Sequence, residues 1–305
     1  MKALITGVSG FVGDYLAKEL LLHNYEVYGM DIIEKKVTNV KFFKVDLLNQ
    51  GEVSRTVDLI NPDVIFHLAA QSSVKKGWEE PELTFDVNVN GTRNVLDAAG
   101  DKIKVLVVGS ADIYGVPKEV PLKETTELRP VSPYGKSRLE QEKLAQEYCK
   151  NGFQIVMSRS FSHTGPGQLP IFVCSDFAKQ VVEIEGGRRK EVMTGNLDVR
   201  RDFSDVRDIV SAYSLAIEKC RIGEVYNICS GNAFSVKEIL DILAGMSDAE
   251  IEVKQDKGKI RKRDIPIMIG DNTKFCSETG WKAKIPLKQT LRDLLDYWRT
   301  QKNNP

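Results

Sequence analysis

Three glycines near the N-terminus, Gly7, Gly10 and Gly13, have the spacing of a turn that binds a pyrophosphate. We expect an apolar strand up to Gly7 and a helix that starts near Gly10. Gly7 permits the tight turn, Gly10 lets the backbone approach the phosphates, and Gly13 lets the helix pack flat on the sheet. The free N–H groups and the dipole at the start of that helix favour negative charge. This stretch therefore predicts a dinucleotide site.

Asp31 closes the next expected strand and lies about 20 residues after the glycine turn. A carboxylate at this place can accept a hydrogen bond from the adenosine ribose 2′-OH, and it would repel a 2′-phosphate. Asp31 therefore favours NAD(H), with NADP(H) as the second choice. The alternative is an ordinary turn residue at the end of a strand.

A serine, an acid, a phenol and a cation could carry chemistry beside such a cofactor. Ser110 and Asp112 follow the fifth expected strand, at the end where parallel sheets bind their ligands. Tyr134 and Arg138 lie four residues apart on a helix expected over residues 134–150, so both project from one helix face. A tyrosine at a helix start is also common in plain packing, so its position alone does not decide the function.

Alternating strands and helices must hold these groups in place. The apolar run over residues 64–70 suits a strand that is buried on both faces of a parallel sheet. The pattern predicts an α/β fold, with a Rossmann-type doubly wound parallel sheet over 1–161 and a smaller C-terminal α/β substrate-binding region over 162–305. We expect the chain to return to the first region around 202–230. Further expected strands lie at 26–30, 41–45, 105–108, 155–158, 191–194, 225–229 and 251–253, and further helices at 50–60, 81–99, 235–246 and after Pro286.

The composition of the 305-residue chain argues against several classes of function. The 43 basic and 43 acidic residues balance, so no field of one sign indicates nucleic acid or an anionic membrane as partner. No apolar run reaches the roughly 20 residues that span a bilayer, and we expect no signal peptide before the first strand. The five scattered cysteines indicate reduced thiols in a cytoplasmic protein. Only three histidines are present, and His67 is expected in the core, so we expect no metal site.

Five motifs together resemble the extended short-chain dehydrogenase/reductase family over essentially the whole chain. They are Thr6-Gly7-x-x-Gly10-x-x-Gly13, His67-Leu68-Ala69-Ala70, Asn88-Val89-Asn90-Gly91-Thr92, Tyr114-Gly115 and Ser132-Pro133-Tyr134-Gly135. Motifs of the second half are similar to the GDP-mannose branch of that family: Gly165-Pro166-Gly167-Gln168, Phe172-Val173, Asp176-Phe177-Ala178-Lys179-Gln180, Gly195-Asn196-Leu197, Arg201-Asp202, and Arg261 with Asp264-Ile265-Pro266.

The resemblance implies hydride transfer at C4 of a GDP-linked sugar. In the reductase direction, NAD(P)H gives a hydride to the 4-keto carbon of GDP-4-keto-6-deoxy-D-mannose, and the product is GDP-D-rhamnose. Tyr134 would give a proton to the developing alkoxide, and Ser110 would hydrogen-bond that oxygen. Such donors stabilise charge only as it develops. The family uses a lysine, four residues after the tyrosine, as the neighbouring cation and as a ligand of the nicotinamide ribose.

Arg138 occupies that lysine position, which is the main departure from the family. Arginine keeps the positive charge, but its planar fork differs from an ammonium. We expect an active enzyme, and from the sequence alone we expect Arg138→Lys to maintain or raise turnover. Asp112 stands where the dehydratase has a glutamate that acts as the C5 base. It is one methylene shorter, which favours reductase over dehydratase.

The resemblance also implies which residues line the two ligands. Around the cofactor they are Gly7, Gly10, Phe11, Val12, Gly13, Asp31, Asp46, Leu47, Leu68, Ala69, Ala70, Tyr134, Arg138 and Phe161. Around the GDP-linked sugar they are Ser72, Ser162, Val173, Lys179, Asn196, Arg201, Arg261 and Asp264, with Ser162 in place of the asparagine usual in this branch. The three cations of this set suit a diphosphate, although each one alone would be an ordinary surface charge.

Three other functions stay open at this point. A GDP-mannose 4,6-dehydratase would recycle a tightly held cofactor, and a nucleotide-sugar 4-epimerase is a more distant choice. A catalytically weak nucleotide-binding dimer is supported only by Arg138, and fold cannot decide among them. Family members often dimerise through helices that correspond to residues 81–99 and 134–150, so we expect a homodimer.

Overall fold

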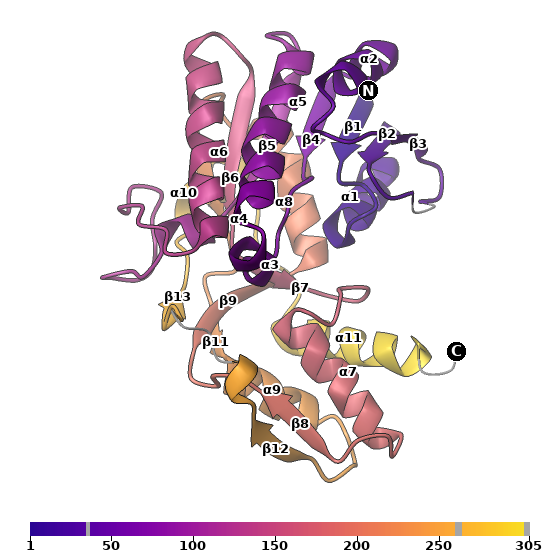
Figure 1. Cartoon of the computed structure of the whole chain (residues 1–305), viewed down its shortest axis with the longest axis vertical. Helices are drawn as coiled ribbons and strands as arrows, with labels where there is room; N and C mark the ends of the chain where they lie inside the picture. Colours follow the sequence, from indigo (N-terminus) through magenta and orange to yellow (C-terminus); the bar gives the residue numbers. More distant parts are fainter. Residues whose placement is uncertain (35–36, 260–263, 302–305) are drawn as a thin grey trace.

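Seven parallel strands build the large sheet in the upper part of Figure 1. The structure is a computed structural model, and it describes residues 1–34, 37–259 and 264–301. The seven strands are β1 (Lys2–Thr6), β2 (Glu26–Asp31), β3 (Lys41–Lys44), β4 (Val64–His67), β5 (Lys104–Ser110), β6 (Ile155–Ser160) and β10 (Val225–Ile228). Every residue of β4 and β6 is buried, as expected for strands that are covered on both faces.

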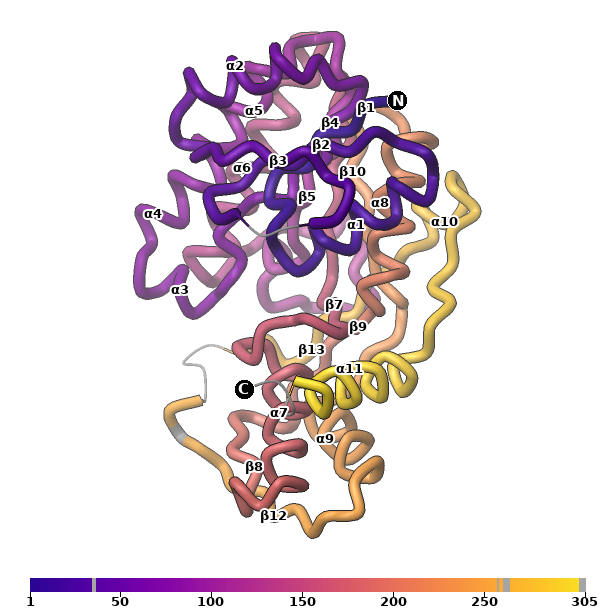
Figure 2. Tube along the Cα trace, turned by 90° about the vertical axis from the view of Figure 1, so that its right-hand side faces the viewer, coloured from indigo at the N-terminus to yellow at the C-terminus, as the bar shows by residue number. Residues whose placement is uncertain are grey.

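The strand order is β10-β6-β5-β4-β1-β2-β3, and each neighbouring pair is parallel. Helices α1 (Phe11–Leu22), α8 (Val206–Lys219) and α10 (Thr273–Thr279) cover one face, and α2 (Gln50–Ile60), α5 (Gly91–Ala99) and α6 (Pro133–Lys150) cover the other (Figure 2). The direction of winding reverses between β1 and β4, where ligands of such sheets bind. This arrangement confirms the predicted Rossmann-type fold. Within the described residues, no helix is long and apolar enough to cross a membrane.

The helix predicted over residues 81–99 is not regular. α4 (Pro81–Phe85) passes into a π-helical turn, η1 (Asp86–Asn90), before α5 begins. Asn88, which is buried in this turn, accepts a hydrogen bond from the backbone N–H of Gln71 at 2.9 Å and donates to the hydroxyl of Ser137 at 2.9 Å. The wider turn therefore aims a polar side chain at the loop after β4 and at α6, which hydrophobic periodicity does not reveal.

The lower part of Figure 1 contains the small sheets of the second half of the chain and the helices beside them. β9 (Arg200–Asp205) pairs with β7 (Ser162–Thr164), β11 (Ala233–Ser235) and β13 (Ile267–Met268), and β8 (Glu191–Thr194) pairs with β12 (Glu252–Gln255). Helices α7 (Val173–Glu185), α9 (Val236–Ala244) and α11 (Leu287–Gln301) pack around one apolar cluster. Ser235 is the N-cap of α9 and forms a capping box with Glu238.

Asp202 of β9 ties the small sheet to the large one. Its carboxylate accepts hydrogen bonds from the backbone N–H groups of Ser230 and Gly231, just after β10, at 2.9 and 3.0 Å. It also accepts from the N–H of Gly270, after β13, at 3.2 Å. Burial raises the pKa of Asp202 despite these bonds. The aspartate of the predicted Arg201-Asp202 motif therefore has a structural role.

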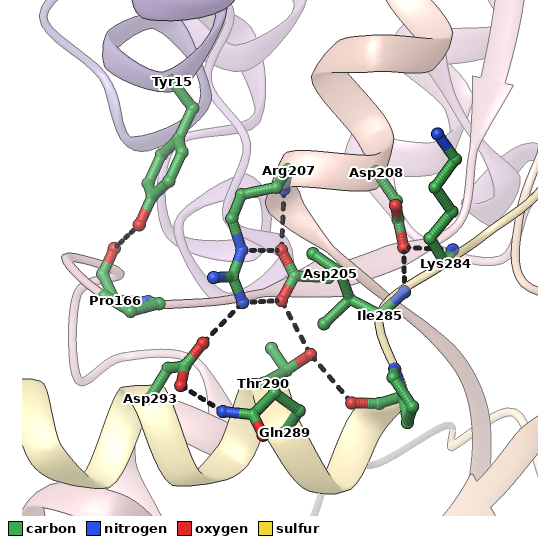
Figure 3. Close-up of polar contacts among 11 residues, drawn as sticks. Tyr15, Pro166, Asp205, Arg207, Asp208, Lys284, Ile285, Gln289, Thr290 and Asp293 are labelled. Atoms are coloured by element: carbon green, nitrogen blue, oxygen red, sulfur yellow. Dashed lines mark hydrogen bonds and ion pairs between the residues drawn. The ribbon is translucent and has the colours of Figure 1, made fainter.

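A second junction lies where α8 begins (Figure 3). The buried carboxylate of Asp205 accepts hydrogen bonds from the backbone N–H of Arg207 at 2.8 Å and from its guanidinium at 2.7 Å. The hydroxyl of Thr290 on α11 donates to the same carboxylate at 2.7 Å, and Arg207 pairs with Asp293 of α11 at 2.6 Å. One acid therefore caps α8 and holds α11 beside it.

We predict that Asp205→Ala lowers the free energy of unfolding by about 3 kcal/mol, because a buried charged group with several partners is lost. Asp293→Ala is the matched control, since it removes only the half-exposed end of the same network and should cost about 1 kcal/mol. Urea denaturation followed by circular dichroism measures both values. Equal losses in the two variants would contradict this account of Asp205.

Candidate active site

The glycine turn after β1 leaves no space for side chains. Gly7 has a φ of +75°, and a Cβ on it would lie 2.8 Å from the backbone N and Cα of Ala69. A Cβ on Gly13 would lie 2.7 Å from the Cα of Val8, so the start of α1 packs tightly against the turn that follows β1. The N-cap of α1 is Gly10, which brings no side-chain acceptor to the first N–H groups of the helix. The turn therefore fits the pyrophosphate predicted for it.

Asp31 lies beside this turn, at the end of β2. Its carboxylate accepts hydrogen bonds from the backbone N–H groups of Ser9 at 3.1 Å and Ile33 at 3.3 Å. Ser9 belongs to the glycine turn, so the acid is held next to the expected pyrophosphate site. This is the place predicted for an acid that binds the adenosine ribose.

The loops after β3 and β4 line the same edge of the sheet. β4 ends at His67, three residues before its predicted end, so the chain after it forms a loop at the switch point. This loop contains Leu68, Ala69 and Ala70, and the loop after β3 contains the exposed Asp46 and the buried Leu47. The structure therefore brings these predicted cofactor residues together at one edge.

Ser110 and Asp112 meet at the end of β5. The Ser110 hydroxyl donates to the Asp112 carboxylate at 3.3 Å and accepts from the Asp112 backbone N–H at 3.2 Å, which starts the turn η2 (Ala111–Tyr114). A Cβ on Gly135 would lie 2.8 Å from the carbonyl oxygen of Asp112, so the start of α6 lies directly against this turn. Tyr134 is thereby brought to the end of β5.

Tyr134 and Arg138 form a buried pair on α6. The Arg138 Nε donates to the Tyr134 hydroxyl at 3.3 Å, and the guanidinium carbon lies 5.3 Å from the centroid of the ring. The two residues are 6% and 5% exposed. They share one helix face, as their spacing predicts, whereas Lys136 is exposed. A fixed cation beside a phenol can stabilise the phenolate.

His67 lies behind the switch point and is a core residue, as predicted. Its Nδ1 is 2.8 Å from the hydroxyl of Thr6 on β1, and its Nε2 is 2.8 Å from the hydroxyl of Thr92 on α5. Burial, with a smaller contribution from Arg138, lowers the pKa of His67 to about 3. The imidazole is therefore neutral near pH 7.

The first two turns of α1 contact the segment that follows β6. Phe11 stacks on His163, with ring centroids 6.5 Å apart, and Tyr15 donates to the carbonyl of Pro166 at 2.9 Å (Figure 3). Phe161, predicted to contact the cofactor, has its side chain in a small buried cluster with Tyr114 and is 2% exposed. Contact with a cofactor would therefore involve the Phe161 backbone.

Seven of the eight predicted substrate residues belong to the C-terminal part of the chain, and the two cations that lie among the described residues, Lys179 and Arg201, have protein partners. Arg201 donates to the carbonyls of Arg200 and Ile265 at 2.9 and 2.7 Å. Lys179 forms an ion pair with Glu183 at 3.8 Å. Three of the remaining residues are placed by the elements around them: Ser72 is exposed just before α3 (Val74–Glu79), Ser162 lies in β7, and Val173 is the first residue of α7. The side chain of Asn196 accepts a hydrogen bond from the backbone N–H of Asp198, and Asp264 is half-buried. Arg261 lies outside the described residues.

Sequence reasoning missed the polar residues that surround Tyr134 and Arg138 inside the fold. Asn88 and Thr92 belong to a motif that carried the family resemblance, but no role had been attached to them. Gln141 was not singled out, although its position three residues after Arg138 places both on one helix face. All three are at most 1% exposed and hydrogen-bonded.

Comparison with known proteins identifies the family. The family model described as GDP-mannose 4,6 dehydratase matches residues 4–294. The chain belongs to this family. Membership confirms the resemblance to extended short-chain dehydrogenases/reductases that the motifs indicate.

Relatives in and around the family include reductases and dehydrogenases of GDP-6-deoxy sugars. The GDP-6-deoxy-D-mannose reductase of Pseudomonas aeruginosa is 31% identical, over 98% of this chain and 98% of its own length. The GDP-6-deoxy-D-talose 4-dehydrogenase of Aggregatibacter actinomycetemcomitans is 33% identical, over 92% of each chain. The structure of RMD from Pseudomonas aeruginosa complexed with NADPH superposes with a TM-score of 0.86 at 30% identity and covers 98% of this chain and 99% of that one.

We predict that His67 makes the fold sensitive to acid. Its pKa is about 3 in the folded state against an ordinary value of 6.5, so the unfolded chain binds the proton more strongly. Its contribution is complete above pH 6.5 and is lost as the pH falls towards 3, by on the order of 4–5 kcal/mol in total. Urea denaturation at several pH values should show a shallower acid slope for His67→Gln than for the native protein.

His23→Gln is the matched control, because His23 is exposed. This variant should keep the acid slope of the native protein. An unchanged slope in His67→Gln would show that the buried imidazole does not control the acid sensitivity.

Proposed function

We propose that this protein reduces the 4-keto group of a GDP-linked 6-deoxyhexose with NAD(P)H. The observation that carries the proposal is the buried Tyr134–Arg138 pair, held beside the Ser110–Asp112 turn at the carboxyl edge of the sheet. A phenol beside a fixed cation can release its proton to a developing alkoxide. The relatives that act on GDP-6-deoxy sugars support the substrate class.

Bound NAD(P)H would supply the hydride that reduces C4. Tyr134 would donate its phenolic proton to the carbonyl oxygen as negative charge develops there, and Arg138 would stabilise the phenolate that remains. The Ser110 hydroxyl would give a second hydrogen bond to the same oxygen, in exchange for its present bond to Asp112. The ketone becomes a secondary alcohol, and Tyr134 regains a proton from solvent. Both donors act most strongly on the transition state.

Asp112 supports a reductase over a dehydratase. Dehydration requires a base that removes the proton at C5, and the aspartate is one methylene shorter than the glutamate that the dehydratases use. Its carboxylate also accepts the hydrogen bond of Ser110 within its own turn. A displacement of about 1 Å can cost a hundredfold in rate, whereas the reduction does not use this base.

The assay that tests the proposal offers two substrates in parallel. With GDP-4-keto-6-deoxy-D-mannose and NADH, we expect consumption of NADH and formation of a GDP-6-deoxyhexose, whose C4 configuration nuclear magnetic resonance assigns as rhamnose or talose. With GDP-mannose and no added cofactor, we expect no product. Tyr134→Phe should lower kcat about a hundredfold or more. A product from GDP-mannose alone would overturn the proposal in favour of the dehydratase.

We further propose that Asp31 makes NADH the preferred coenzyme, although the similar Pseudomonas aeruginosa structure contains NADPH. A 2′-phosphate would lie against the Asp31 carboxylate and be repelled. Asp31→Asn should raise kcat/KM for NADPH relative to NADH about tenfold or more, while Asp31→Glu, which keeps the charge, should preserve the preference for NADH. Steady-state kinetics with NADH and NADPH measure this preference. A native enzyme with a higher kcat/KM for NADPH would contradict the role proposed for Asp31.

A homodimer through the helices next to this site belongs to the same proposal. Leu83 and Phe85 of α4 are 46% and 43% exposed, and they lie on a helix that packs beside α6. Large apolar side chains at such a surface are typical of protein contacts. Size-exclusion chromatography with light scattering would measure the molecular mass in solution and so test whether the protein is a dimer.

A further inference from the structure

The guanidinium of Arg138 is held by three acceptors. Its Nε donates to the Tyr134 hydroxyl, its Nη1 donates to the carbonyl of Val108 on β5 at 3.2 Å, and the same Nη1 donates to Oε1 of Gln141 at 2.8 Å. The Gln141 contact is the shortest of the three, and Gln141 is 1% exposed. The amide therefore takes a large part in deciding where the guanidinium lies.

The hydrogen bonds beyond Gln141 fix the orientation of its amide. Its Nε2 donates to the hydroxyl of Thr92 at 2.8 Å, and that hydroxyl donates its only proton to the carbonyl of Asn88 at 2.7 Å. His67 Nε2 must therefore donate to Thr92 as well, which leaves Nδ1 as the acceptor for Thr6. With the nitrogen of Gln141 committed to Thr92, only its oxygen can face Arg138.

We propose that Gln141 is a positioning residue for proton transfer by Tyr134. Its oxygen holds the guanidinium of Arg138 so that Nε faces the phenol, and its nitrogen anchors this arrangement through Thr92 and His67 to Thr6, the residue before the glycine turn. The proposal rests on the proposed function for its catalytic meaning, while the arrangement itself can be tested without substrate.

The geometry explains how arginine serves at a position where the family uses lysine. A guanidinium carries its N–H donors in one rigid plane. Its Nε can therefore donate to the Tyr134 hydroxyl while its Nη1 donates to Gln141. An ammonium donates from a single nitrogen and cannot reproduce this spacing. The structure therefore leads to a different expectation from the sequence: Arg138→Lys should lower turnover.

The other charged and titratable groups around Tyr134 and Arg138 do not take over the role of Gln141. His67 of β4 and Tyr213 of α8 interact electrostatically with the pair. Burial lowers the pKa of His67 to about 3 and raises the pKa of Tyr213, so both are neutral near pH 7. Glu142, which follows Gln141 on α6, forms an ion pair with Arg159 at 2.7 Å. Asp112 of η2 accepts a hydrogen bond from the Ser110 hydroxyl.

The test compares Gln141→Leu and Gln141→Glu with Gln146→Leu, a control on the same helix outside this network. Kinetics of ketone reduction should show a fall in kcat of about tenfold for the leucine variant and more for the glutamate variant, whose carboxylate would neutralise Arg138. KM should change less than twofold. In Arg138→Lys, the further change Gln141→Leu should cost less than twofold, because the contact is already lost.

A second readout needs no substrate. Alkaline difference spectra against the matching Tyr134→Phe protein, with NAD bound, report the pH at which the Tyr134 phenolate forms. This midpoint should move to higher pH in Gln141→Leu and further in Gln141→Glu, and stay unchanged in Gln146→Leu. Thermal denaturation identifies variants that fail to fold, and Gln141→Asn, which keeps both amide groups on a shorter stem, then serves in place of the leucine variant.

The two readouts separate the two claims. If the native protein does not reduce the sugar, the proposed function fails and the spectra still test Gln141. If the Gln141 and Gln146 variants have the same phenolate midpoint and the same kcat, the positioning role is overturned.

Discussion

The contact between the backbone of Gly7 and the backbone of Ala69 is the constraint on which the rest of the site depends. The turn after β1 and the loop after β4 approach so closely that no side chain fits between them. The two loops lie where the winding of the sheet changes direction, which is where ligands of such sheets bind. Ser110 and Tyr134 reach the same edge because β5 lies next to β4 and α6 leads on from that edge.

Much of this arrangement could be predicted from the sequence because its signals are local. The glycine spacing, the apolar strands and the four-residue interval from Tyr134 to Arg138 each concern one short segment, and the structure has them as expected. The π-helical turn at Asn88 and the burial of the Phe161 side chain depend on segments far apart in the chain. No periodicity within one helix or strand reports such contacts.

The buried polar groups show for an energetic reason why contacts between distant segments could not be predicted from local patterns. Burying an amide, a hydroxyl and an imidazole is unfavourable unless each finds its partners. Gln141, Thr92 and His67 satisfy one another across three separate elements, and Thr6 adds a fourth. These bonds fix the arrangement of the donors and acceptors in the network. In the sequence, each of these residues is a common polar residue, and only the fold shows that they bond to one another.

The bond between Arg138 and Gln141 also bears on which substitutions the fold can accept. A change at either position alone leaves the other buried and short of a partner, so intermediates with one change are disfavoured. Substitutions at positions 138 and 141 should therefore be tolerated better together than singly.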